Sequence, residues 1–402
     1  MKRFRPYRLH TFLLPASARV PPSHGLPAFF LLAASLLLLH CKKPYDPPAI
    51  TAANNYLVVD GIINTGIAAV TSIRVDRTRN LGDSTPGGIP ELQATVTIVS
   101  GSGASYPLKD TANAGVYTSA PMTLDRTQTY KIFITTQDGR KYASDGVPVK
   151  TTPQLDSAYY EEPGDFTVYV DTHDPSGNTR YYRWDYTETW EHDAQLMSPW
   201  GVKDGMIFLY DSTNQRTQCW TTADATNVLI GSSEKLSQDV INRMPIRVLP
   251  NGDPKIDQKY SILVRQYALT AEAYDYWSLI QKTSQQLGGL FDLQPSQLTG
   301  NIHCLTNPGE PVIGYLSASS IEQQRVFVFQ SNLHNWIHNP PVYGCDTIAV
   351  PVNQTDYRIY SETDTIWAPY YFVTNGPLVL ATKTCVDCTL FGGTNQKPSY
   401  WK

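Results

Sequence analysis

Short runs in which apolar and polar residues alternate dominate residues 55–150. In the run 70–77, Ile73 and Val75 alternate with polar neighbours, as in a strand with one buried face. Comparable runs occur at 56–60, 95–100, 130–136 and 141–144. Turn residues separate these runs, and none has the spacing of a helix. The pattern predicts an N-terminal immunoglobulin-like β-sandwich over residues 55–150.

The dipeptide Asp138-Gly139 lies between two of these runs, 130–136 and 141–144. A tight two-residue turn needs φ > 0 at both central positions, and the Asp-Gly pair tolerates this conformation. The sequence therefore predicts a β-hairpin at this point.

The second region, residues 154–402, is also predicted to be rich in strands. In the run 179–190, the two-residue period places Tyr182, Trp184 and Tyr186 on one face of a strand. An aromatic face of this kind is typical of a buried core, and the alternative is a surface that binds a ligand or a partner. Further strands are predicted at 260–269 and 325–330.

Two helices are predicted within this second region. Residues 271–287 have roughly helical apolar spacing, with Thr270 as the N-cap. A shorter helix is predicted at 237–243, with Ser237 as its N-cap. The predicted fold is mainly β, with an N-terminal sandwich joined by a linker at 147–153 to a larger β-rich domain that contains one or two helices.

The first 40 residues have the pattern of the leader of an exported protein. Five basic residues precede the uncharged apolar run 28–39, and Cys41 follows that run closely. The run is shorter than the roughly 20 residues that span a bilayer. This order predicts a lipoprotein signal peptide over residues 1–40, cleaved before Cys41, which then carries lipid. An ordinary secretory leader is the alternative, because His40 stands where a small residue is usual.

Length and charge restrict what the rest of the chain can be. Residues 41–54 are rich in proline and polar residues, which is typical of a tether between a lipid and a folded body. The chain has 402 residues, enough for two domains after that tether. Its formal net charge is −4, and it has no basic stripe, so no nucleic-acid partner is expected.

Six cysteines add candidate chemistry. Without Cys41 their number is odd, so at least one thiol stays free or pairs with another chain. Cys385 and Cys388 form a Cys-x-x-Cys pair, and Cys345 is the nearest candidate partner for either. Export from the cytoplasm favours a structural disulfide, with a zinc site and a redox pair as alternatives. No metal or other cofactor is expected.

The remaining polar groupings match functional motifs only in part. His334 and His338 have the spacing of a zinc-binding helix, without the glutamate of a zinc protease. Residues 171–182 begin like a calcium loop, but Tyr182 stands where the loop needs a glutamate. The sequence contains neither a Gly-x-Ser-x-Gly elbow nor a phosphate-binding glycine loop.

Several phrases keep a characteristic order along the chain, among them LVVDG (57–61), YKIFITTQDGRKYAS (130–144), YYRWDYTETW (181–190), YSILVRQYALTAEAYDYW (260–277) and CVDCTLFGGTNQKPSYW (385–401). Together they resemble a family of lipoproteins from Bacteroidota-type bacteria that is catalogued as domain of unknown function 4249. The last phrase is the most specific. The resemblance implies an outer-membrane lipoprotein that works beside TonB-dependent receptors, and it makes Cys304 the expected unpaired cysteine.

Three functions compete on these observations. A non-enzymatic binding or accessory module, held at the outer membrane by lipid on Cys41, agrees with the leader and with the lack of a catalytic motif. A hydrolase of glycans or peptides outside the inner membrane is the second, because acid and base residues need not be near in sequence. The third is a surface adhesin or structural protein, and the fold alone cannot choose among the three.

Overall fold

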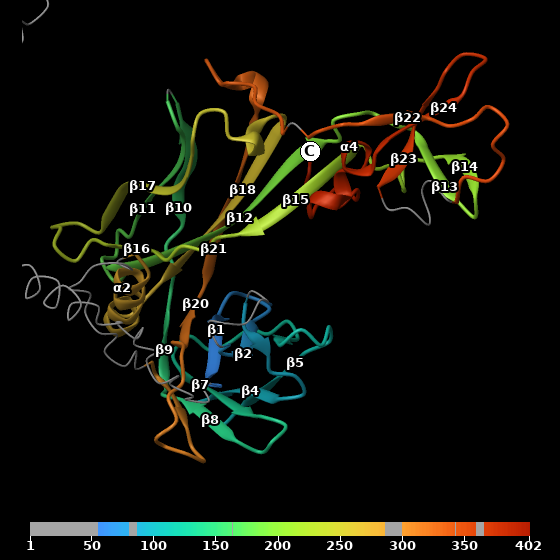
Figure 1. Cartoon of the computed structure of the whole chain (residues 1–402). Helices are drawn as coiled ribbons and strands as arrows, with labels where there is room; N and C mark the ends of the chain where they lie inside the picture. Colours follow the sequence, from blue (N-terminus) through green and yellow to red (C-terminus); the bar gives the residue numbers. More distant parts are fainter. Residues whose placement is uncertain (1–54, 80–86, 163, 286–299, 342, 359–365) are drawn as a thin grey trace, which may run out of the picture. The chain divides into compact units, whose positions relative to one another are not determined.

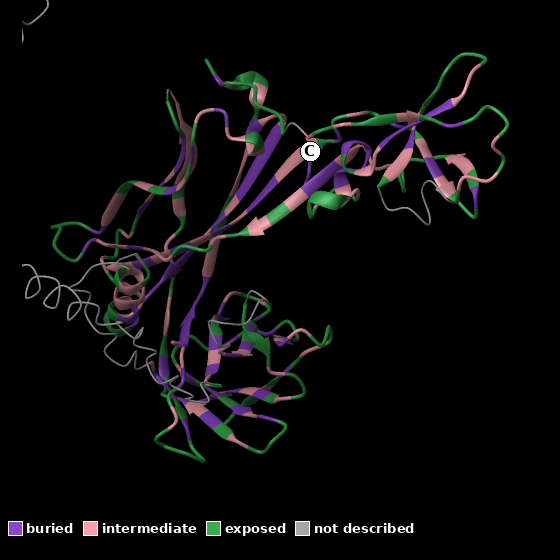
Figure 2. Ribbon diagram, viewed as in Figure 1, coloured by how far each residue is buried: buried purple, intermediate pink, exposed green. Residues whose placement is uncertain are grey.

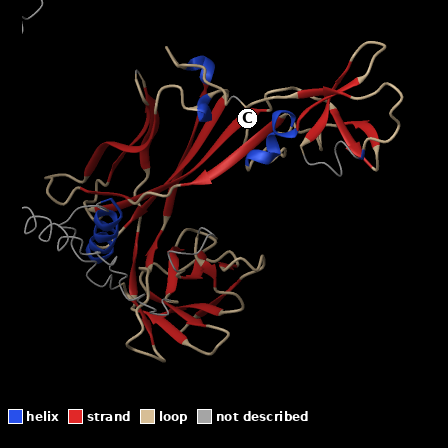
Figure 3. Ribbon diagram, viewed as in Figure 1, coloured by secondary structure: helices blue, strands red, loops and turns tan. Residues whose placement is uncertain are grey.

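The fold is mainly β, as the sequence predicts. The computed structural model describes residues 55–79, 87–162, 164–285, 300–341, 343–358 and 366–402. Within these ranges the chain forms 24 strands, the α-helices α2 and α4, and three 3-10 helices (Figures 1 and 3). In the described ranges, no helix combines the length and the apolar character needed to cross a membrane.

Eight strands close into a mixed β-barrel in the N-terminal part of the described chain. Strand β20 pairs in parallel with both β1 and β9, and the pairing of β7 with β9 completes the ring. The barrel strands are β1 (Leu57–Asn64), β2 (Ser72–Arg77), β4 (Thr95–Ser100), β5 (Ser105–Lys109), β6 (Val116–Ser119), β7 (Thr129–Thr135), β9 (Val147–Lys150) and β20 (Ser317–Ser319). Three more strands extend the sheet: β3 (Ile89–Pro90), β8 (Lys141–Ser144) and β19 (Ile302–Cys304).

This closed ring replaces the immunoglobulin-like sandwich that the sequence predicted. The short runs in the sequence are strands, but three strands of the ring, β5, β9 and β20, were not predicted. Residues 147–150, expected in a linker, form β9, and Val147 is buried in the barrel core. Strand β20 is a three-residue Ser-Ala-Ser segment that arrives from much later in the chain. Closing the ring leaves its strands without free edges.

The barrel core follows the alternation seen in the sequence. In β4, Val96 and Ile98 are buried and alternate with more exposed residues, and β7 shows the same pattern. The hairpin predicted at Asp138-Gly139 is present, since β7 pairs with β8 and the N–H of Gly139 donates to the carbonyl of Thr136. Gly139 has φ +84°, which glycine adopts without strain.

Gly314 lies where the segment before β20 runs closely beside β1. The N–H of Val59 donates to the carbonyl of Ile313 at 2.9 Å, and Gly314 has φ +138°. A Cβ atom at residue 314 would stand 2.1 Å from the carbonyl oxygen of Val59. We expect Gly314→Ala to lower the free energy of unfolding by about 2 kcal/mol, because the backbone of β1 must move. Urea denaturation measures the loss.

Gly309→Ala is the matched control on the same connection. A Cβ atom there would meet only the side chain of Asn307, at an ordinary contact distance of 3.7 Å. Equal unfolding free energies for the two variants would show that the close approach at Gly314 does not constrain the barrel.

Two further sheets share a second hydrophobic core. A five-stranded sheet contains β12 (Tyr181–Asp193), β15 (Gln218–Asp224), β16 (Leu229–Ser232), β18 (Lys259–Ala268) and β21 (Ile321–Phe329). A three-stranded sheet contains β10 (Leu155–Glu161), β11 (Phe166–His173) and β17 (Val240–Leu249). Their common core includes Phe166 of β11, Ile246 of β17 and Ile262 of β18. Figure 2 shows buried residues along β12 and β18.

The aromatic face predicted on 179–190 belongs to this core. Tyr182, Trp184 and Tyr186 of β12 are all buried, and the rings of Tyr182 and Trp184 stack with their centres 5.7 Å apart. The interpretation as core therefore describes these residues, and their side chains offer no exposed surface to a ligand or partner.

One of the two predicted helices is present in the described residues. Helix α2 covers Ala271–Gln285, and the hydroxyl of Thr270 accepts a hydrogen bond from the N–H of Ala273. The helix predicted at 237–243 is wrong, because β17 begins at Val240. Asp239, just before β17, is buried, and its carboxylate accepts a hydrogen bond from the hydroxyl of Tyr182.

Smaller elements complete the C-terminal part of the chain. A hairpin pairs β13 (Trp200–Lys203) with β14 (Met206–Leu209), and a three-stranded sheet contains β22 (Thr347–Ala349), β23 (Trp367–Phe372) and β24 (Leu378–Thr382). The remaining helices are η1 (Pro254–Ile256), η2 (Gln330–Asn332), α4 (Lys383–Val386) and η3 (Cys388–Phe391). Leu378 and Leu380 of β24 pack with Ile207 of the hairpin in one small core.

Candidate functional site

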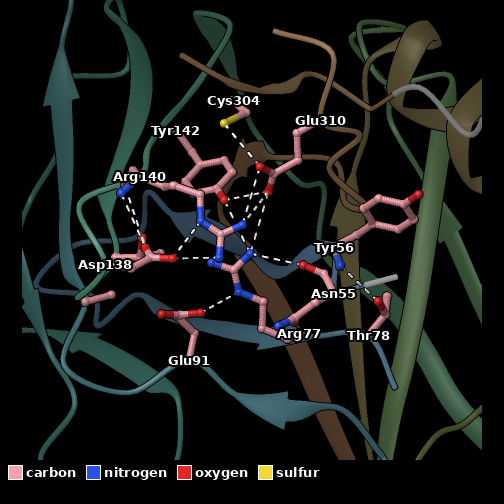
Figure 4. Close-up of polar contacts among 12 residues, drawn as sticks. Asn55, Tyr56, Arg77, Thr78, Glu91, Asp138, Arg140, Tyr142, Cys304 and Glu310 are labelled. Atoms are coloured by element: carbon pink, nitrogen blue, oxygen red, sulfur yellow. Dashed lines mark hydrogen bonds and ion pairs between the residues drawn. The ribbon is translucent and has the colours of Figure 1, made fainter. Parts of the chain in front are cut away.

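A buried cluster of charged side chains joins the end of β2 to the connection between β19 and β20 (Figure 4). Arg77 is 4% exposed, and its Nε donates to Glu91 Oε2 at 2.5 Å. The guanidinium also lies 3.6 Å from the carboxylate of Glu310, to which the hydroxyl of Tyr142 donates at 2.6 Å. Burial and the bond to Glu310 raise the pKa of Tyr142 well above its ordinary value.

The outer side of this cluster is more exposed. Arg140 lies 3.3 Å from Glu310 and 2.7 Å from Asp138, and hydrogen bonds from Arg140 and Thr136 lower the pKa of Asp138. The buried thiol of Cys304 approaches Glu310 Oε2 at 3.7 Å (Figure 4). Each carboxylate of the cluster pairs with an arginine side chain of the same protein. The cluster is therefore suited to holding segments of the chain together.

The cluster also holds the first described residues of the chain, Asn55 and Tyr56. Arg77 Nη1 donates to the carbonyl of Asn55 at 3.2 Å. The N–H of Tyr56 donates to the hydroxyl of Thr78 at 3.0 Å (Figure 4). These two bonds fix the start of the described chain to the end of β2.

A cavity of about 370 Å³ is the second candidate, and it lies against the five-stranded sheet. Its walls come from β12, β15, β21, the start of β18 and the C-terminal segment. The lining residues are Glu191, Gln218, Trp220, Gln258, Lys259, Phe329, Lys397, Trp401 and Lys402. Aromatic faces with a few charged groups, in a volume of this size, are typical of a binding site for a small molecule.

Lys259 forms part of the cavity wall within a group of aromatic rings. Its ammonium lies 4.6 Å from the ring centre of Phe329 and 5.1 Å from that of Trp401. The residue is only 6% exposed, and its ammonium donates to the main-chain oxygen of Lys402. Burial lowers the pKa of Lys259; the charge of Glu191 opposes this shift, and that of Lys397 adds to it.

The hydrogen-bonding groups of the cavity differ in how far they are satisfied. Glu191 accepts from the indole N–H of Trp401 at 2.8 Å and from the side-chain amide of Gln218 at 2.6 Å. Trp220 is 5% exposed, and among the described residues its buried indole N–H has no hydrogen-bond partner. Trp220, one of the residues that line the cavity, therefore carries an unpaired hydrogen-bond donor.

The closing segment of the chain holds one side of the cavity in place. Thr394 and Trp220 exchange two backbone hydrogen bonds, at 2.8 and 2.9 Å. The guanidinium of Arg325 lies 3.7 Å from the ring centre of Tyr400, and the Tyr400 hydroxyl lies 2.9 Å from that of Thr189. These contacts give a structural role to the aromatic residues that end the phrase CVDCTLFGGTNQKPSYW.

Comparison with protein families matches residues 42–325 to the family described as Domain of unknown function (DUF4249). That is more than half of the chain. The chain belongs to the DUF4249 family. Five of the cavity residues of this DUF4249 protein lie inside the matched region, and Phe329, Lys397, Trp401 and Lys402 lie beyond it.

Other comparisons add little to the DUF4249 assignment. No curated protein matches the sequence. Among solved structures, the chain is similar to a DUF4785 family protein from Legionella pneumophila, with 11% sequence identity and a TM-score of 0.18. The similarity covers 52% of this chain and 52% of that chain, so the match spans about half of the Legionella protein.

Two disulfides tie the C-terminal part of this DUF4249 chain together. Cys345 pairs with Cys385, one of the pairings that the sequence left open. Cys388 pairs with Cys219 of β15, a partner that the sequence analysis did not identify. The zinc and redox alternatives for Cys385-x-x-Cys388 are wrong, because the two sulfurs belong to different disulfides. Cys304 is the free cysteine of the described residues.

The other residues singled out from the sequence do not come together in a site. His334 pairs with Glu162 at 2.9 Å and His338 with Asp257 at 2.8 Å. The carboxylate of Asp174 accepts hydrogen bonds within its own turn, including one from the N–H of Ser176. No group of three or more metal-ligating side chains suited to a metal ion occurs in the described ranges. Cys41 lies outside the described residues.

The sequence analysis missed the cavity because its residues come from five separate segments. The closing phrase CVDCTLFGGTNQKPSYW supplies Lys397 and Trp401 to the cavity, but in the sequence it stood out only for its resemblance to a family. Trp220 and Lys259 lie in the same cavity only because β15, β12 and β18 pair in one sheet, and no local pattern specifies that pairing.

Proposed function

We propose that this chain is an outer-membrane lipoprotein of Bacteroidota-type bacteria that acts as a non-enzymatic binding module beside a TonB-dependent receptor. The two disulfides are the observation that carries the proposal. Disulfides form and persist outside the cytoplasm, which agrees with the leader and with lipid on Cys41.

The cavity supports binding in preference to catalysis. Its carboxylate, Glu191, already accepts hydrogen bonds from Trp401 and Gln218. A general acid or base must instead reach a proton of the substrate. The aromatic and lysine side chains around it are suited to holding a ligand for transfer to a receptor.

The lipid anchor is tested by Cys41→Ser. We expect the wild-type chain to take up a radioactive fatty acid and to fractionate with membranes, and the variant to lose both properties, because the thiol carries the acyl chains. From gently solubilised membranes, affinity purification of the wild type is expected to recover a TonB-dependent receptor.

Cys304→Ser is the matched control, since it removes the free cysteine of the folded part and is expected to keep both label and membrane location. Labelling of the Cys41→Ser variant would disprove the anchor. Repeated recovery of the wild-type lipoprotein without a receptor would disprove the partner.

A further inference from the structure

We infer that the cavity beside Trp220 and Lys259 binds an organic anion, namely a carboxylate carried on a six-membered ring. The inference deepens the proposed binding role and rests on it. It names the ligand class from the charges, the unused donor and the rings of the cavity wall.

The charges of the cavity favour an anion. Among the lining side chains there are three lysines and one carboxylate, that of Glu191, whose two oxygens both already accept hydrogen bonds. Lys259 is occupied by the main-chain oxygen of Lys402. The exposed ammonium groups of Lys397 and Lys402 are therefore the two positive charges best placed to meet a ligand.

The unused indole N–H of Trp220 indicates where an acceptor atom fits. A buried donor without an acceptor destabilises a protein, and an acceptor supplied by a ligand removes that penalty. Trp220 lines the cavity, and its N–H has almost no area open to water, so a ligand acceptor reaches it only when the ring or its neighbours shift on binding. One oxygen of a ligand carboxylate can accept from Trp220 while the other faces the lysines, and a hydrogen bond to a charged acceptor is stronger than one to a neutral acceptor.

The aromatic walls favour a ring over an inorganic anion. Phe329, Trp401 and Trp220 contribute apolar faces, and the volume of about 370 Å³ exceeds what a small inorganic ion fills. A sugar acid and an aromatic acid share the required chemistry, which is a flat or chair-shaped ring that bears a carboxylate.

Calorimetric titration of the full chain, purified in detergent, tests the inference. The probes are glucuronate, benzoate, glucose and inorganic phosphate. We expect one of the two ring acids to bind at least about tenfold more tightly than glucose and phosphate, because only these acids offer both a ring and a carboxylate. Binding of glucuronate alone identifies a sugar acid, and binding of benzoate alone an aromatic acid. Absence of binding by both acids, or equal binding of phosphate, would overturn the inference.

Two variants separate a ligand role from a structural one. Trp220→Phe keeps a ring but removes the N–H, so affinity for the acid is expected to fall about tenfold while the unfolding temperature is unchanged or higher. Lys397→Gln, at an exposed position, is expected to weaken binding about threefold. Lys109→Gln, an exposed lysine on β5, is the control and leaves affinity unchanged.

Wild-type affinity in both Trp220→Phe and Lys397→Gln would refute this ligand assignment. These results distinguish a wrong ligand assignment from a wrong proposed function, because a receptor can be recovered with the lipidated chain whether or not the chain binds the acid. Conversely, a chain that binds the acid but carries no lipid would leave the cavity assigned and the envelope location disproved.

Discussion

Replacing both Cys219 and Cys388 with alanine is expected to lower the free energy of unfolding by about 5 kcal/mol. The bond joins residues 169 positions apart, so its loss frees a very long loop in the unfolded chain. It also releases the segment that carries Thr394 and Trp401 against the sheet. We therefore expect binding to the cavity to weaken together with stability. Urea denaturation and the calorimetric titration measure the two effects.

The double variant Cys345→Ala with Cys385→Ala is the matched comparison. That bond spans 40 positions, and the same chain-entropy argument gives a loss of about 4 kcal/mol. We expect acid binding to persist in it, since neither cysteine lines the cavity. A larger loss of unfolding free energy for the shorter loop would contradict the chain-entropy argument. Loss of acid binding in this variant alone would contradict the role of the Cys219–Cys388 bond in holding the cavity.

Glu310→Gln is expected to destabilise the protein by about 3 kcal/mol, because it removes one of the carboxylates around a buried cation. Glu310 lies near Arg77, Arg140 and the hydroxyl of Tyr142, and its side chain is 10% exposed. Glu91 remains beside Arg77 in the variant. We therefore expect the loss of unfolding free energy to lie at the lower end of the range for a broken buried ion pair. Urea denaturation measures the change.

Asp138→Asn is the control within the same cluster. Its carboxylate pairs with Arg140, but its side chain is 52% exposed, so water screens the pair and a loss below about 1 kcal/mol is expected. Equal losses for the two variants would show that burial of the cluster does not determine its contribution.

The local elements were predictable where a single strand or helix carries its own pattern. In β7, Tyr130, Ile132 and Ile134 alternate with exposed residues, and this period appears in the sequence as it does in the structure. Thr270 and the spacing after it predicted α2. The helix predicted at 237–243 was wrong because this segment pairs as β17, and Asp239 accepts a hydrogen bond from Tyr182 of another strand, a contact that no local pattern shows.

The closure of the barrel was not predictable from such patterns. Strand β20 consists of Ser317, Ala318 and Ser319, and its sequence has no strand period. It is a strand because β1 and β9 lie on either side of it. The same reasoning explains the partner of Cys388, since Cys219 becomes its neighbour only after β15 has joined the sheet.

The sequence by itself was enough to predict export with lipid on Cys41, a mainly β composition and the individual strands with one buried face. Each of these predictions depends on residues close together in the chain. Only the tertiary structure decided that the barrel closes through β20, that Cys219 bonds Cys388, and that Trp220 and Lys259 face the closing segment across one cavity. These features join residues far apart in the chain, and their contacts form only when several sheets have assembled, so no local period encodes them.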